Sequence, residues 1–145
     1  MYRFLAVPLL FATIAAAPPQ PVVQVATGDW SQLPALEHRN DNHLGSNGMA
    51  RIFQLAAQRK CMIPGYTYRK LDLRVSFAVQ YNADGSPARI VVPPLNCPEA
   101  ESIIASSVLA MVKARDFAPR GPAADQGWYR GTLVWGYEAD GQSKI

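Results

Sequence analysis

The stretch from Leu71 to Tyr81 constrains the fold most, because apolar and polar residues alternate along its whole length. Leucine, valine, phenylalanine or tyrosine occupies every odd position, and a polar residue or alanine occupies every even one. A period of two places all the apolar side chains on one face of a β-sheet. The sequence therefore predicts a half-buried strand over residues 71–81.

A tight turn follows this strand. Asp84 and Gly85 tolerate the positive φ angles of a short hairpin, so residues 88–92 are expected to return antiparallel to the first strand. Pro93 and Pro94 lack the N–H groups that a sheet needs, and they are expected to end the pairing.

Two helices and a third strand complete the predicted fold. One helix is expected after Ser46 or Asn47, and a second from Pro98 to about Arg115, where apolar residues recur at helical spacing. A third alternating stretch covers 128–138. The expected class is α+β: a three-stranded antiparallel sheet with two helices packed on one face. A helical connection makes the second and third strands parallel to each other, so the predicted spatial order is 2-1-3.

The order of these features resembles the TonB C-terminal domain: an alternating strand, the Asp84-Gly85 turn, a second strand, an apolar helix, the segment from Arg115 through Phe117 to Pro119, and a last strand. The resemblance covers roughly residues 44–138. It implies a periplasmic TonB/TolA-type protein-binding domain of the cell envelope without enzymatic activity. It also implies that an extended segment of an outer-membrane or other envelope protein pairs with the last strand.

The N-terminus has the three parts of a secretory signal: Arg3, an apolar run over 4–14, and the small residues 15–17. We expect a signal peptide over 1–17, an extended or irregular arm over 18–43, a TonB-like domain over 44–140, and a periplasmic location. The alternative is an uncleaved leader that anchors a TonB-type energy transducer for outer-membrane transport. About 20 apolar residues are needed to span a bilayer, and Pro8 interrupts this shorter run.

Charge and motif content favour a binding protein over an enzyme. The 14 basic and 11 acidic residues give a net charge of +3, too small to predict a nucleic-acid partner. No nucleophile motif or phosphate-binding glycine loop is present. His38 and His43 flank Asp41, but this set lacks the spacing of a known metal site. We therefore predict no catalytic residue, no metal and no cofactor.

Cys61 and Cys97 are the only cysteines, and each adjoins the end of a predicted helix. An oxidising compartment converts accessible thiol pairs into disulfides, so we predict a Cys61–Cys97 bond. A redox-active pair would normally show the closer Cys-x-x-Cys spacing.

The partner site is predicted on the exposed edge of the third strand, where a partner in extended conformation could add a strand. It comprises Thr132, Leu133, Val134, Trp135, Gly136 and Tyr137. The alternative is that the arm over 22–32, which contains the β-prone Val22, Val23 and Val25, folds back and occupies that edge itself. A structural or inhibitory envelope protein without peptide capture is a further possibility.

Overall fold

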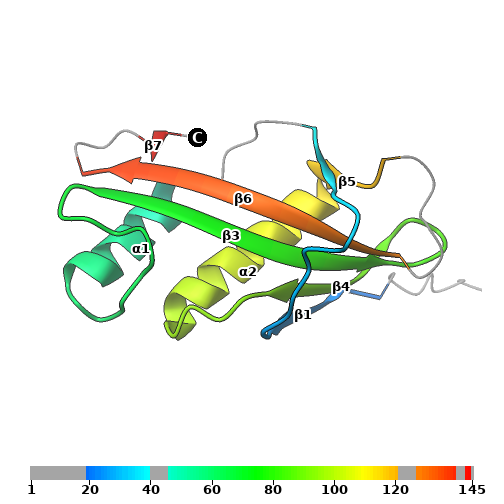
Figure 1. The fold of residues 1–145 in the computed structure, drawn as a ribbon, viewed down its shortest axis with the longest axis horizontal. Coiled ribbons are helices and arrows are strands. Elements are labelled where there is room, and N and C mark those ends of the chain that lie inside the picture. Colours follow the sequence, from blue (N-terminus) through cyan, green and yellow to red (C-terminus); the bar gives the residue numbers. More distant parts are fainter. Residues whose placement is uncertain (1–18, 40–45, 121–126, 140–142, 145) are drawn as a thin grey trace, which may run out of the picture.

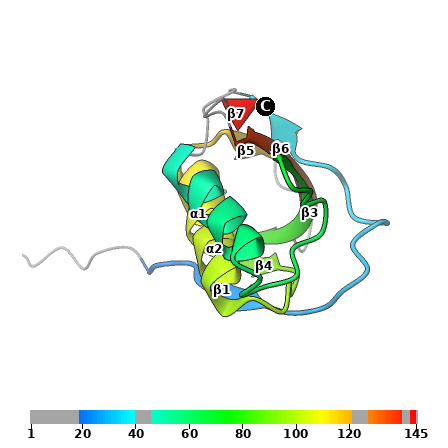
Figure 2. The same cartoon turned by 90° about the vertical axis from the view of Figure 1, so that its left-hand side faces the viewer.

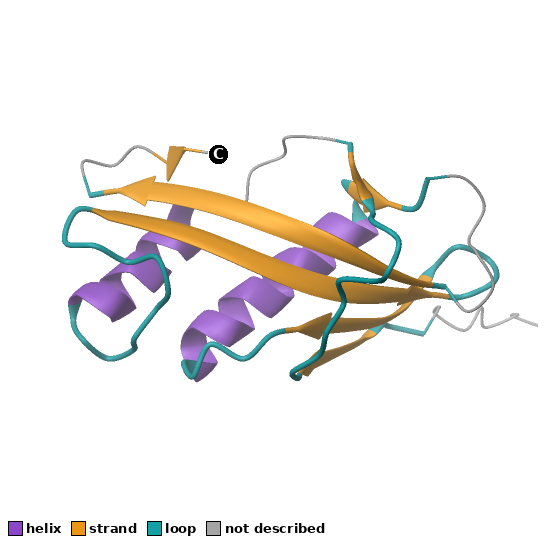
Figure 3. Ribbon diagram, viewed as in Figure 1, coloured by secondary structure: helices purple, strands orange, loops and turns teal. Residues whose placement is uncertain are grey.

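The computed structural model describes residues 19–39, 46–120, 127–139 and 143–144, and the leader expected over 1–17 lies outside them. The elements follow in the order β1 (Val22–Val25), β2 (Glu37–His38), α1 (Ser46–Ala57), β3 (Lys70–Tyr81), β4 (Pro87–Val92), α2 (Pro98–Lys113), β5 (Phe117–Ala118), β6 (Trp128–Glu138) and β7 (Ser143–Lys144). Two helices combine with a mixed sheet, so the predicted α+β class is confirmed (Figure 1, Figure 3).

Strand β3 lies at the centre of the main sheet and pairs antiparallel with β4 on one side and β6 on the other. Its odd-numbered residues are buried, and its even-numbered residues, apart from the fully buried Ala78, are exposed or half-buried. The alternation in the sequence therefore corresponds to the two faces of the sheet.

The β3–β4 turn follows from its Asp-Gly pair. Gly85 has a φ of 79°, and its N–H donates to the carbonyl oxygen of Asn82 over 2.9 Å. The Asp84 carboxylate accepts hydrogen bonds from the backbone N–H of Ser86 at 2.9 Å and from its hydroxyl at 2.6 Å. These hydrogen bonds, the hydroxyl bond foremost, lower the pKa of Asp84, so the ionised carboxylate stabilises the turn.

The three predicted strands pair antiparallel in the predicted order 2-1-3, as β4-β3-β6. The prediction that these three make up the whole sheet, with all its strands antiparallel, is wrong. The sheet has five strands in the order β1-β4-β3-β6-β7, and β1 runs parallel to β4. A separate two-stranded sheet joins β2 to β5. The arm thus contributes two strands. The β-branched residues of β1 occupy an edge of the main sheet, whereas β2 contains none and pairs with β5.

Both helices cover the same face of the sheet (Figure 2). Ile104 and Val108 on α2 are 2% and 0% exposed, and Val75 and Phe77 on β3 are 1% and 0% exposed. All four residues belong to one core cluster, which also includes Ile52 of α1. The sheet and the helices therefore form two layers around a single apolar core.

The predicted disulfide between Cys61 and Cys97 is confirmed, with the two Cα atoms 5.6 Å apart. Cys97 is also the N-cap residue of α2, but its side chain makes no capping hydrogen bond. Instead, the Glu101 carboxylate reaches back and accepts from the N–H groups of Leu95 at 2.7 Å and Cys97 at 3.4 Å. The disulfide therefore joins the end of one helix to the start of the other.

The segment between β1 and β2 runs along the sheet face opposite the helices (Figure 2). Near its end, the backbone N–H of Leu36 donates to the carbonyl oxygen of Arg130 on β6 over 2.8 Å. Leu36 is 9% exposed and belongs to the core cluster. The arm is therefore an integral part of the fold.

Candidate functional site: the outer edge of strand β6

The hydrogen bonds of Arg130 show which residues of β6 face its outer edge. The N–H of Arg130 donates to the carbonyl oxygen of Pro34 at 2.9 Å, and its own carbonyl oxygen accepts from Leu36. In an antiparallel ladder, successive residues direct their N–H and C=O groups to alternate sides of the strand. The even-numbered residues of β6 therefore present their backbone groups outward, and the odd-numbered residues bond to β3.

Two other segments of the chain occupy the ends of this outer edge. Pro34 and Leu36 cover it at Arg130, and β7 covers it at Gly136 and Tyr137. Between these ends, the outward N–H and C=O groups of Thr132 and Val134 have no hydrogen-bond partner among the described residues. We refer to Thr132 and Val134 as the open edge.

Within the predicted partner site, the structure thus separates two kinds of residue. Thr132 and Val134 face outward, and the side chain of Val134 is exposed, at 57%. Leu133 and Trp135 are each 4% exposed and belong to the core, so their side chains are not available to a partner. Tyr137 is half-buried against Phe53, with ring centroids 5.1 Å apart.

The arm was the predicted competitor for this edge, and β1 instead pairs with β4 at the opposite side of the sheet. The segments that do border the open edge, Pro34–Leu36 and β7, were not predicted from the sequence. The sequence signal for the first was the short apolar run from Leu33 to Leu36, which is followed by the polar residues Glu37 to Asn40.

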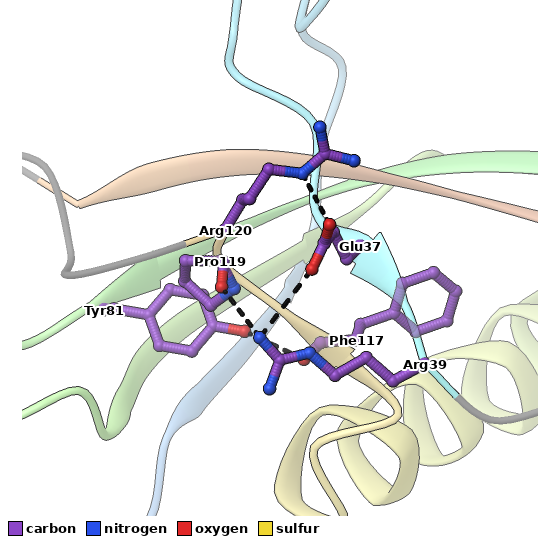
Figure 4. Close-up of polar contacts among 6 residues, drawn as sticks. All are labelled: Glu37, Arg39, Tyr81, Phe117, Pro119 and Arg120. Atoms are coloured by element: carbon purple, nitrogen blue, oxygen red, sulfur yellow. Dashed lines mark hydrogen bonds and ion pairs between the residues drawn. The ribbon is translucent and has the colours of Figure 1, made fainter.

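A polar cluster holds the arm beside this edge (Figure 4). Glu37 forms ion pairs with Arg39 and Arg120, and Arg39 also donates to the carbonyl oxygen of Pro119 at 3.2 Å. These pairs are exposed, so each stabilises the fold only slightly. The backbone bond from Arg39 to Asp116, at 2.7 Å, joins the arm to β5 independently of charge.

Aromatic residues pack below this polar cluster. The ring of His38 stacks on Phe117, with centroids 4.7 Å apart, and the Tyr81 hydroxyl donates to the carbonyl oxygen of Phe117 at 3.3 Å. Burial raises the pKa of Tyr81 to about 12, with Tyr129 adding to the effect and Arg39 opposing it. Phe117, which is 3% exposed, is therefore a packing residue.

A depression of about 630 Å³ lies between the β3–β4 turn, the C-terminal end of α2 and β5. Its lining includes the cations Arg39, Lys113 and Arg115. Lys113 donates to Gln20 and Arg39 is bonded to Pro119, so two of these cations are already engaged within the fold.

The described residues contain no group of three or more His, Cys, Asp or Glu side chains that could hold a metal ion. His43, the second histidine of the cluster considered above, lies outside the described residues. Neither described helix is long and apolar enough to cross a membrane.

Comparison of the chain with protein-family models, with curated proteins and with solved structures found no match. The resemblance to the TonB C-terminal domain therefore stays a prediction from the sequence.

Proposed function

We propose that this protein is a non-enzymatic, exported binding module that captures an extended segment of a cell-envelope protein by strand addition at β6. The observation that supports the proposal is the open edge, where the backbone donors and acceptors of Thr132 and Val134 have no partner in the described part of the chain and lie beside an exposed valine side chain. The TonB-like order of elements points to the same strand and to a periplasmic location.

The other side of the sheet is a poorer site. Ala26 donates to the carbonyl oxygen of Val92 at 3.0 Å, so even-numbered residues of β1 bond to β4 and odd-numbered ones face outward. Pro21 occupies an outward position by the same alternation and has no N–H to offer. Proline at this position protects the edge of β1 against pairing, and no proline lies within β6.

The size of the open edge sets the expected strength of binding. Thr132 and Val134 together offer two backbone donors and two backbone acceptors. Each hydrogen bond contributes a net 0.5–1.5 kcal/mol, so the four contribute about 2–6 kcal/mol to the free energy of binding before the cost of ordering the partner is subtracted. This energy favours a transient complex unless side-chain contacts with Val134 add to it. The proposed partner therefore binds reversibly and places an apolar side chain next to Val134.

Replacing Val134 with proline tests the site, because it removes an outward donor that the β6–β3 ladder does not use. We expect Val134→Pro to abolish retention of a partner from an envelope extract, with the partner identified by mass spectrometry and confirmed as a synthetic peptide. Hydrogen exchange on the free protein should show fast amides at 132 and 134 that slow when the peptide is added.

Val25→Pro is the matched control, since it removes an outward donor from the opposite edge. It should leave peptide binding unchanged. Equal binding by Val134→Pro and the unmodified protein, or slow exchange at 132 and 134 in the free protein, would contradict the proposal.

A further inference from the structure

The connection between α1 and β3, residues 58–69, exposes two large apolar side chains. Met62 is 94% exposed and Tyr68 is 87% exposed. The other exposed large apolar residues of the described chain, Val134, Val22 and Val25, range only from 57% down to 45%. This connection, called the 58–69 loop below, therefore presents the most accessible apolar side chains in the described part of the protein.

The exposure of Met62 is imposed by its neighbours. On one side, Cys61 is bonded to Cys97, and on the other, Ile63 is 6% exposed and belongs to the core. Further along the loop, Tyr66 packs edge-on against Phe53 with ring centroids 5.4 Å apart. Met62 thus lies between two residues that are anchored inward, and the fold holds its side chain outward.

The backbone on both sides of Tyr68 is fixed in a similar way. The N–H of Thr67 donates to the carbonyl oxygen of Lys70 at 2.7 Å, and the carbonyl oxygen of Arg69 accepts from Ala139 at 2.8 Å. Earlier in the loop, the carbonyl oxygen of Gly65 accepts from Asp72 at 3.0 Å. A binding partner would therefore meet a preformed surface, which lowers the entropic cost of association.

The loop is also basic. No acidic residue occurs from Gln58 to Leu71, whereas Arg59, Lys60, Arg69 and Lys70 are cations. Lys70 pairs with Asp72 at 2.7 Å, and the other three form no ion pair within the described residues. The nearby Glu99 is already bonded to Arg51 at 2.6 Å. This hydrogen bond with Arg51 lowers the pKa of Glu99, and Lys60 also lies close enough to help lower the pKa of that carboxyl group. None of the three cations is held in an ion pair among the described residues, so they can still attract an anionic partner.

The position of the loop suits contact with a flat surface. It lies at one end of the long axis of the molecule, at the left of Figure 1, and Figure 2 views the molecule from this end with the loop in front. The open edge of β6 lies on a different part of the surface, between β7 and the arm. A partner on the loop would therefore leave β6 accessible.

We propose that the 58–69 loop is a peripheral docking site for an anionic lipid surface. Met62 enters the boundary between headgroups and acyl chains, Tyr68 lies at headgroup level, and Arg59, Lys60 and Arg69 contact lipid phosphates. This pairing of exposed apolar side chains with unpaired cations is the chemistry of interfacial binding, in which buried apolar area and attraction to anionic headgroups act together. An uncharged apolar partner would leave the cations uncompensated, and a soluble polyanion would leave Met62 exposed.

Sedimentation with lipid vesicles tests the proposal on the full-length protein with its disulfide intact. We expect binding to phosphatidylglycerol vesicles at low salt, and little binding to phosphatidylcholine vesicles. The double substitution Met62→Ser/Tyr68→Ser should weaken partitioning by about tenfold. Arg59→Gln/Lys60→Gln should weaken it by about 30-fold, because each cation near an anionic surface contributes about a factor of five.

Control variants carry the same chemical changes elsewhere on the surface. Val22→Ser removes an exposed valine, and Arg74→Gln/Arg89→Gln removes two exposed cations from the sheet. Both should bind vesicles as the unmodified protein does, and circular dichroism should show that all variants are folded. The proposal is overturned if phosphatidylglycerol vesicles fail to retain the protein, or if the control variants weaken binding as much as the loop variants do.

Discussion

Gly131 of β6 has no side chain, and the ring of Phe77 fills the space beside it. Replacing Gly131 with alanine therefore tests the packing of the core. A Cβ atom added there would lie 2.1 Å from Cζ of Phe77 and 2.5 Å from its Cε1. Carbon atoms in ordinary contact are about 3.5–4.0 Å apart, so one of the two residues would have to move. Gly131 and Phe77 face each other directly in the register of β6 and β3.

The ring of Phe77 has little space to withdraw. It is fully buried and packs edge-to-face on Phe117 with centroids 5.2 Å apart. Forcing an extra methyl group into a well-packed core costs about 1–3 kcal/mol, and the short distances here place Gly131→Ala at the upper end of that range. The reduced freedom of alanine in the unfolded chain offsets only about 0.5–1 kcal/mol. We therefore expect a net loss of about 2 kcal/mol in the free energy of unfolding.

Urea unfolding of the oxidised protein, followed by tryptophan fluorescence and circular dichroism, measures this loss. Phe77→Leu shortens the ring, so the double variant Gly131→Ala/Phe77→Leu should be more stable than the sum of the two single losses predicts, by at least about 1 kcal/mol. Gly85→Ala is the control: it introduces strain at a φ of 79°, but its added Cβ meets nothing within 4 Å. Its cost should add simply to that of Phe77→Leu. A Gly131→Ala protein as stable as the unmodified one, or additive losses in the double variant, would refute the packing described here.

Two further predictions concern the disulfide and Tyr81. Replacing both Cys61 and Cys97 with serine removes a cross-link between residues separated by 36 positions. The chain-entropy model predicts that the free energy of unfolding, measured with urea, falls by about 4 kcal/mol. A fall of less than about 1 kcal/mol would contradict this prediction. The pKa of Tyr81 is raised to about 12 in the folded protein, so folding favours its protonated form. The contribution of this preference to the free energy of unfolding is complete below about pH 10 and is lost as the pH rises toward 12. Tyr81→Phe has no titratable group at this position, so its free energy of unfolding should fall less between pH 9 and pH 12 than that of the unmodified protein.

The sequence alone identified the elements whose residues carry a local periodic pattern. Strand β6 has the predicted bounds, and β3 and α2 begin within one residue of theirs, because alternation and helical spacing recur over eleven or more residues in each. The disulfide followed from two cysteines beside predicted helix ends. Packing of α2 on the sheet followed from the helical spacing of its apolar residues, and Ile104 is one of those that the structure buries.

The short strands could not be predicted in the same way. Strands β2, β5 and β7 have two residues each, which is too few to show a period. Their pairing depends on which distant segment lies beside them: Glu37 faces Ala118, and Gly136 faces Lys144. The extent of the open edge depends on these contacts, so the candidate site could be assigned to a strand but not to its two available residues.

The location of β1 shows why a β-prone sequence does not determine which edge it occupies. In the register with β4, Val23 lies beside Ile90 and Val25 beside Val92, and both partners are fully buried. Strand β1 also contacts α2, and Val23 packs against the core there. At the edge of β4 the arm therefore gains apolar burial as well as hydrogen bonds. At the open edge of β6 it would gain mainly hydrogen bonds, because the inward-facing Leu133 and Trp135 are already buried. Burial thus explains why the arm pairs with β4 and not with the edge formed by Thr132 and Val134, which is the edge that we propose as the partner site.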